Sequence, residues 1–329
     1  MSWLLNKKNA SRRLIARYWL IGLGLLFFIQ GLLGCATLRR PMIPMARIEG
    51  AKRPYFPGQI LNLRDKRLLN YSQLIHRLSG ADVVFIGEIH DNPDHHLIQA
   101  QVLQSLISKW GKLVLAVEFL PYTMQPTIDK YLAGGLSEPE FLRKVNWEDT
   151  WGFDYHFYRP LMQLAKQANC HIIGINAPHE LVKKVARKGL AALTPDERNR
   201  LPREIDLTDT QHKEYLRKVY ESHEHNKIKE FDYFYQAQCV WEETMADNIA
   251  NYLEHGNEKI VVLCGNGHIY YDFGIPKRLR RRIGAQTATL IPYPLETKTL
   301  LKNNTGDFLW LTGKYLRLSH MRHRKKAEE

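Results

Sequence analysis

Two stretches of this chain share a buried-strand pattern and the same polar ending, and this repetition constrains the fold more than any other feature. Residues 81–86 and 259–264 are mostly apolar and rich in β-branched side chains, and each run is followed by a Gly-x-x-His phrase, at residues 87–90 and 265–268. A short run that is apolar on both faces is typical of a strand inside a parallel sheet. Open parallel sheets bind ligands at the carboxyl ends of their strands. The two histidines are therefore expected at the rim of one crevice.

Further strand patterns alternate with helical segments along the chain. Residues 112–117 and 171–175 are expected to be buried strands that end in Glu118 and Asn176, and residues 287–291 are expected to add a fifth strand. Strands that alternate with helices indicate right-handed βαβ units.

The sequence therefore predicts an α/β fold over residues 61–300, with a mostly parallel central sheet flanked by helices. The helical pattern is in excess at about residues 122–165 and 180–255. We expect these segments to form a helical cap subdomain over one end of the sheet.

Polar side chains of two kinds, carboxylate and imidazole, stand where these strands end. The residues expected to converge there are Glu88, His90, Glu118, Asn176 and His268. Their clustering is inferred from topology, since they come from four separate strand ends. Imidazoles and carboxylates are ligands of divalent transition metals, and a carboxylate beside an imidazole can act as a general base. His96, at the start of the next helical pattern, is a further candidate ligand.

The N-terminus has the pattern of an exported lipoprotein. Residues 1–34 carry five basic residues, no acidic ones and an apolar stretch that ends in Leu-Leu-Gly, and Cys35 follows. This describes a secretory signal peptide with a lipobox, whose cysteine is acylated, for example with palmitate. A single-pass anchor is the alternative, although the apolar stretch is shorter than the usual span of about 20 residues. We expect a lipid-anchored protein of the bacterial cell envelope, on the outer membrane and facing the periplasm or the cell surface.

Composition excludes several other classes. Residues 35–60 are expected to be a linker from the membrane anchor and residues 301–329 a basic C-terminal tail. The net charge of +13 rests largely on clusters of basic residues, which are usually solvated faces, so we expect no nucleic-acid partner. The chain lacks C-x-x-C, H-E-x-x-H, Gly-x-Ser-x-Gly and a phosphate-binding glycine loop, which argues against zinc knuckles, zincins, serine hydrolases and nucleotide-binding proteins.

Several of these segments occur in the same order in a known family. They are Gly87–His90, Pro93 with His95 and His96, Glu118 with Phe119, the aromatic segment Trp147–Pro160, Gln238–Ala246, and Gly265–His268 with Gly274–Pro276. Over roughly residues 60–295 the chain resembles the ChaN-type haem-binding lipoproteins. These belong to a wider group with the Tiki and TraB/PrgY proteins and, more distantly, with erythromycin-esterase-like enzymes.

The resemblance implies an iron-regulated lipoprotein that binds haem for iron or haem uptake, as a homodimer that encloses two stacked haems. In such sites a tyrosinate ligates the iron and basic groups hold the propionates. The resemblance therefore points to Tyr270 or Tyr271 as the axial ligand, to Lys277 or Arg278 as propionate partners, and to His96 as a further cofactor contact.

The competing interpretation is enzymatic. The resemblance to Tiki-type proteins implies a metal-dependent protease or esterase, in which His90 and His268 hold a divalent metal together with Glu88 or Glu118, and a glutamate activates water. A third possibility is that such a metal site persists in a protein that only binds haem. The sequence leaves these alternatives open.

Overall fold

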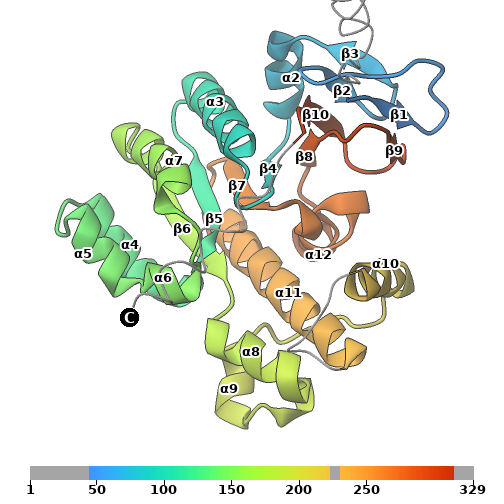
Figure 1. Cartoon of the computed structure of the whole chain (residues 1–329). Coiled ribbons are helices and arrows are strands. Elements are labelled where there is room, and N and C mark those ends of the chain that lie inside the picture. Colours follow the sequence, from blue (N-terminus) through green and yellow to red (C-terminus); the bar gives the residue numbers. More distant parts are fainter. Residues whose placement is uncertain (1–43, 223–229, 315–329) are drawn as a thin grey trace, which may run out of the picture. The chain divides into compact units, whose positions relative to one another are not determined.

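The computed structural model describes residues 44–222 and 230–314, which contain a central sheet of eight strands (Figure 1). Across the sheet the strands are β3 (Arg67–Leu69), β2 (Ile60–Asn62), β10 (Phe308–Thr312), β8 (Thr287–Pro294), β4 (Val83–Glu88), β7 (Ile260–Gly265), β5 (Val114–Pro121) and β6 (His171–Asn176). The six strands from β10 to β6 are parallel, and β2 and β3 pair antiparallel. The predicted mostly parallel α/β fold is therefore confirmed, including the fifth strand at residues 287–291.

The central strands are apolar on both sides because the two sides of the sheet face two separate hydrophobic cores. Side chains alternate across a strand, so Val84 and Ile86 of β4 enter one core, while Val83 and Phe85 enter the other. The neighbouring strand β7 divides in the same way. This explains why the sequence shows continuous apolar runs in place of the alternation typical of a half-exposed sheet.

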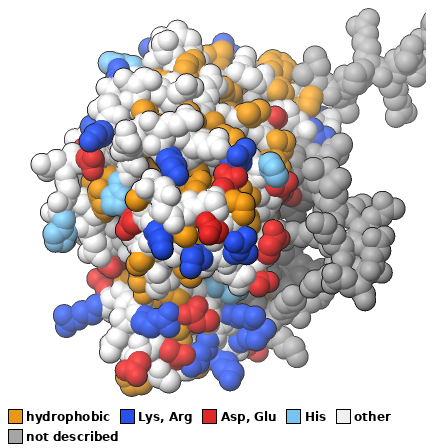
Figure 2. Space-filling model, turned by 90° about the vertical axis from the view of Figure 1, so that its left-hand side faces the viewer, with side chains coloured by type: hydrophobic (Ala, Val, Ile, Leu, Met, Phe, Trp, Pro, Cys, Tyr) orange, Lys and Arg blue, Asp and Glu red, His pale blue; other side chains and the backbone are white. Residues whose placement is uncertain are grey.

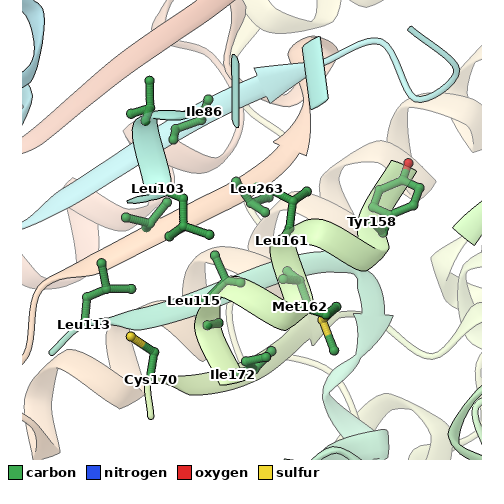
Figure 3. Packing of buried hydrophobic residues seen from close by; sticks show 14 of the residues in the cluster. Ile86, Leu103, Leu113, Leu115, Tyr158, Leu161, Met162, Cys170, Ile172 and Leu263 are labelled. Atoms are coloured by element: carbon green, nitrogen blue, oxygen red, sulfur yellow. The ribbon is translucent and has the colours of Figure 1, made fainter. Parts of the chain in front are cut away.

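One core is covered by the helix that precedes β4 and by the helices that follow β4 and β5. They are α2 (Tyr71–Leu78), α3 (Pro93–Trp110), α4 (Gln125–Leu132), α5 (Glu138–Lys144), α6 (Trp147–Thr150) and α7 (Tyr155–Gln167). Helix α3 begins where the Asn92 side chain accepts a hydrogen bond from the Asp94 amide and Pro93 occupies the first turn, as is common at helix starts. Figure 3 shows Leu103 of α3 and Leu161 of α7 packed over strand residues that include Leu115 and Leu263.

The other core is covered by α12 (Ile275–Ile283) and by the second half of α11 (Phe231–His255). The first half of α11 packs instead against two helices that lie beyond the sheet, α8 (His179–Lys188) and α10 (Thr210–Glu221) (Figure 1). The short helix α9 (Pro195–Asn199) is joined to α8 by the ion pair between Lys184 and Glu197. Part of the helical excess therefore forms a cap, as expected. The difference from the prediction is that α7 and the end of α11 cover faces of the sheet, because their apolar side chains complete the two cores.

Both ends of the described chain contribute strands that the sequence patterns did not reveal. Within the expected linker, β1 (Ala46–Ile48) pairs with β9 (Thr299–Leu301) in a separate two-stranded sheet. Within the expected basic tail, β10 lies between β8 and β2. These two boundaries are thus corrected: the segments are short, and their apolar side chains are buried only by pairing with strands distant in sequence.

Residues 1–43 lie outside the described part of the chain. They include the expected signal peptide, Cys35 and the start of the expected linker. Among the helices of residues 44–222 and 230–314, none combines the length and the apolar character needed to cross a membrane.

Helix α3 offers a matched pair of substitutions that tests its orientation. Leu103 is fully buried, whereas Leu97 on the same helix is 68% exposed. Leu103→Ala is expected to lower the free energy of unfolding by about 2–5 kcal/mol, because it leaves a cavity in the core. Leu97→Ala should change it by about 0.5 kcal/mol or less. Urea denaturation measures both, and equal effects would contradict the packing of this helix.

Candidate functional site

The candidate site lies where the connections after neighbouring strands leave the sheet on opposite sides. The chain passes from β4 through α3 to β5 over one core, and from β7 through α12 to β8 over the other. Since β4 and β7 are adjacent and parallel, their two exits diverge and open a crevice at the carboxyl ends of the strands. Ligands bind at such switch points in open α/β sheets.

The first imidazole of this crevice is held by a buried carboxylate. Nδ1 of His90 lies 2.7 Å from Oε1 of Glu88, the last residue of β4. The same carboxylate accepts hydrogen bonds from the Tyr158 hydroxyl at 2.9 Å and from the Gln99 amide at 2.8 Å. Glu88 is therefore fixed from α3 and α7, and it fixes the His90 ring in turn.

The second imidazole lies between two carboxylates. Nε2 of His268 is 3.3 Å from Oε1 of Glu118, and its Nδ1 is 3.3 Å from Oε1 of Glu242 on α11. The Glu118 carboxylate also accepts a hydrogen bond from the Gly265 amide at 2.6 Å. Glu242 is paired on its other side with Arg278 of α12 at 3.2 Å. Buried charges of alternating sign thus run from β5 to α12.

These contacts determine the protonation of the site. Burial alone would raise the pKa of Glu88, but the hydrogen bond from His90 and the charges of His96 and His90 hold it at about 2. Burial alone would lower the pKa of His268, yet the Glu118 and Glu242 carboxylates raise it to about 10. Glu118 and Glu242 have lowered pKa values because the charges of neighbouring imidazoles outweigh the effect of burial.

Two positions of the crevice require glycine, because a neighbouring side chain lies too close to the backbone there for a β-carbon to fit. A β-carbon at Gly87 would overlap the Asn266 side chain. A β-carbon at Gly265 would come within 3.0 Å of the His90 ring, which is closer than side chains normally pack. The glycines of the repeated phrase therefore allow the ends of β4 and β7 to bring their polar residues together.

The crevice contains a cavity of about 340 Å³ with a mixed polar and aromatic lining. Its lining residues include His90, Glu118, Asn176, His179, Gln238 and His268, with Phe119, Trp151, Phe153 and Trp241 as the aromatic walls. The structure thus brings together four of the five residues expected to converge, and the fifth, Glu88, supports His90 from behind. The Asn176 amide also binds the Glu118 carbonyl oxygen at 2.8 Å.

The remaining candidates lie away from the cavity lining. His96 is buried below the site, where its Nε2 is 3.0 Å from the His90 carbonyl oxygen. Tyr270 and Tyr271 pack in a separate aromatic group with Tyr293 and Tyr215. The roles predicted for these residues in haem binding stay predictions.

The two basic candidates, Lys277 and Arg278, already have acidic partners. Lys277 pairs with Asp209 at 2.6 Å, and Arg278 is buried between Glu242 and Glu243. On the face shown in Figure 2, basic and acidic side chains are interspersed. The positive net charge is therefore not gathered into one patch on that face.

In the part of the chain that the structure describes, no group of three or more His, Cys, Asp and Glu residues is arranged to hold a metal ion. The metal-ligand roles predicted for Glu88, His90, Glu118 and His268 stay predictions. What the geometry shows is two imidazoles, each oriented by a carboxylate, at a partly aromatic cavity.

Sequence reasoning missed the residues that complete the site from the helices. Tyr158 and Gln99 hold Glu88, Glu242 holds His268, and Trp241 forms a wall of the cavity. The sequence indicated some of these residues only indirectly. Tyr158 lies in the segment Trp147–Pro160, and Trp241 and Glu242 lie in Gln238–Ala246, two segments that stand out for their composition. Neither segment indicates by itself which side chain turns inward.

Deprotonation of His268 is expected to destabilise the protein at alkaline pH. Its pKa of about 10 in the folded state lies above the ordinary value of 6.5. The stabilisation from its two carboxylates is therefore fully present below pH 6.5 and is lost as the pH rises toward 10. His268→Asn should remove this part of the pH dependence of unfolding in urea.

The control for this experiment is His156→Asn, because the His156 side chain is 86% exposed. This variant should keep the alkaline loss of stability seen in the wild type. The wild type and His268→Asn could instead lose stability in parallel over this pH range. That result would contradict the stabilisation of protonated His268 by Glu118 and Glu242.

Comparisons with known proteins identify the family and the fold. A family model described as haem-binding uptake, Tiki superfamily, ChaN, matches residues 74–279. The solved structure of ChaN from Campylobacter jejuni, described as showing cofacial haem binding, has a TM-score of 0.62 and 19% sequence identity, and the match covers 80% of this chain and 98% of that one. A mutant of the erythromycin esterase EreC in its open conformation has a TM-score of 0.45 and 14% identity, with 72% and 76% of the two chains covered. No curated protein sequence matches the chain. Since the family model spans more than half of the chain, the protein belongs to the ChaN family of the Tiki superfamily.

Proposed function

We propose that this protein binds haem in the cavity at the carboxyl ends of β4, β5 and β7 and that it serves haem uptake. The observation that carries the proposal is the family match over residues 74–279, a range that includes Glu88, His90, Glu118 and His268. The fold shared with Campylobacter jejuni ChaN, whose structure is described by its cofacial haem binding, supports it.

The residues of the cavity fit a haem in their chemistry. Haem is a flat, largely apolar ring whose iron accepts imidazole, thiolate, thioether or phenolate ligands when it is bound. The aromatic walls Phe119, Trp151, Phe153 and Trp241 suit the ring, and the imidazoles of the lining supply donors of the required kind.

A homodimer is part of the same proposal, because the resemblance to ChaN implies one. The cavity, at about 340 Å³, lies within the range of about 300–1,000 Å³ that is usual for ligand sites. A second copy of the chain, facing the first, would cover a haem bound there.

The alternative function, a metal-dependent hydrolase, is not favoured by the family match, which is to haem-binding uptake proteins. The carboxylates that would activate water in such an enzyme are engaged otherwise. Glu88 binds three side chains, and Glu118 binds an imidazole and a backbone amide. These contacts suit carboxylates that orient imidazoles.

The first test of haem binding is a titration of the purified full-length protein with haemin. Ligation of the iron in an apolar site should shift and sharpen the Soret band to a defined stoichiometry, and sedimentation velocity should show whether haemin promotes a dimer. Protein unfolded in urea serves as the control for nonspecific binding. A spectrum equal to that of haemin with unfolded protein would rule the proposal out.

We further propose that the protein is tethered to the bacterial envelope through an acylated Cys35, with residues 1–34 removed as a signal peptide. Cells grown with labelled palmitate should label the wild type but not Cys35→Ser. Cys170→Ser, which changes a buried cysteine of the core, should keep the label. Labelled Cys35→Ser protein would contradict the tether.

A further inference from the structure

The end of the molecule where the described chain begins carries most of its exposed large apolar side chains. Strands β1, β3 and β9 lie together at this end, away from α8 and α9 (Figure 1). In the described part of the chain four large hydrophobic side chains are exposed, and Phe56, Leu68 and Leu300 of this end are three of them. Leu300 is the most exposed of all, at 80%. Apolar side chains that gather on a surface indicate an interaction site.

Two of these apolar side chains turn to the same side of the small sheet that β1 forms with β9. Arg47 pairs with Leu300 across the two parallel strands, and both side chains are exposed. On the other side of β1, Ala46 pairs with Tyr55, and both are buried in the core. Because successive side chains of a strand point to opposite faces, Phe56 lies on the outward side together with Arg47 and Leu300. We call the side that these three residues share the outer face.

The charges near the outer face are mostly positive and have no acidic partners. In residues 44–69 and 295–302 the exposed acidic side chains are Glu49, Asp65 and Glu296, and the exposed basic ones are Arg47, Lys52, Arg53, Arg64, Arg67, Lys298 and Lys302. Among the described residues no ion pair includes any of these basic side chains. By contrast, every basic side chain of α12 is paired with a carboxylate. This end of the molecule therefore presents cations that are free to meet an anionic partner.

The same end of the molecule is the one to which the proposed lipid anchor is joined. Only residues 36–43 separate Cys35 from Pro44, where the described chain begins. An extended chain spans at most about 3.6 Å per residue, so Pro44 would lie within roughly 30 Å of the acylated cysteine. Strand β1, which carries Arg47, follows almost directly after Pro44. A tether this short keeps the outer face close to the membrane surface.

We propose that the outer face docks on the membrane that holds the anchor and recognises its anionic phospholipids. The inference rests on the tether through Cys35 proposed above. Phe56 and Leu300 enter the boundary between headgroups and acyl chains, where apolar side chains of membrane-surface proteins lie. Arg47 and the basic side chains near it contact the lipid phosphates. The outer face shares no residue with the lining of the cavity, so docking and haem binding use separate residues.

The test uses the mature acylated protein in vesicles, with a spin label on the outer face. Leu300→Cys provides the labelling position, because Cys170, Cys239 and Cys264 are buried. On vesicles of phosphatidylethanolamine and phosphatidylglycerol, an aqueous nickel complex should lose most of its access to the label. On vesicles of phosphatidylcholine alone it should keep that access. A label at Lys183→Cys, an exposed position of α8 at the other end of the molecule (Figure 1), should stay accessible on both.

Charge reversal separates docking of the outer face from attachment by the anchor. Each basic side chain near an anionic membrane strengthens binding by about fivefold. Arg47→Glu combined with Lys298→Glu should therefore shift the docking equilibrium by at least about 25-fold toward the undocked state and restore access to the label, while the acyl chain still holds the protein on the vesicles. The matched control is Lys183→Glu combined with Arg187→Glu, at two exposed positions of α8, and it should leave the label shielded.

Three results would overturn the inference. The label at position 300 could be as accessible on anionic vesicles as the label on α8, or it could be shielded equally on neutral vesicles and after charge reversal. It could also be shielded in detergent before any vesicle is added, in which case a second copy of the chain or another segment of this one covers the outer face. Failure of the tether is told apart from these results by mass spectrometry, because the N-terminal peptide would then carry no acyl chain, and the docking inference would fail with it.

Discussion

The parallel pairing of β4 with β7 is the interaction on which the rest of the site depends. The register places Gly87 opposite Cys264 and Glu88 opposite Gly265, so the two Gly-x-x-His phrases start within one residue of each other along the sheet. Strand β5 lies on the other side of β7 and delivers Glu118 to the same edge. A shift of one residue in either pairing would turn each side chain to the opposite face, and the imidazoles would no longer share a cavity.

The charges that this pairing brings together explain why side chains of the helices take part in the site. Burying a charge without a partner is costly, and removing one member of a buried pair typically destabilises a protein by about 3–5 kcal/mol. Glu88, Glu118 and Glu242 are buried, and each faces an imidazole. The partners come from both helical layers, so α7 and α11 contribute to orienting the imidazoles as well as to covering the sheet. Orientation of the two rings and stability of the fold thus depend on the same contacts.

The sequence predicted the parallel core and the strand ends well, because continuous β-branched runs and the repeated Gly-x-x-His phrase are local signals. It predicted neither β10 nor β1, whose few residues become strands only through partners distant in the chain. The resemblance offered Lys277 or Arg278 as propionate partners, and this role stays a prediction. What the sequence did not indicate is that the Arg278 side chain is buried between Glu242 and Glu243. A run of basic residues does not reveal which one turns inward, since that depends on how α12 packs against α11.

The central claim, that haem occupies the crevice at the ends of β4, β5 and β7, can be tested most directly by paramagnetic broadening. In protein labelled with nitrogen-15 at tryptophan, ferric haem should broaden the indole signals of Trp151 and Trp241, which line the cavity. The signal of Trp110, whose indole donates to the Ser79 carbonyl oxygen, should stay sharp. Sharp signals from Trp151 and Trp241 in the haem-loaded protein would contradict the account, because the iron would then lie elsewhere.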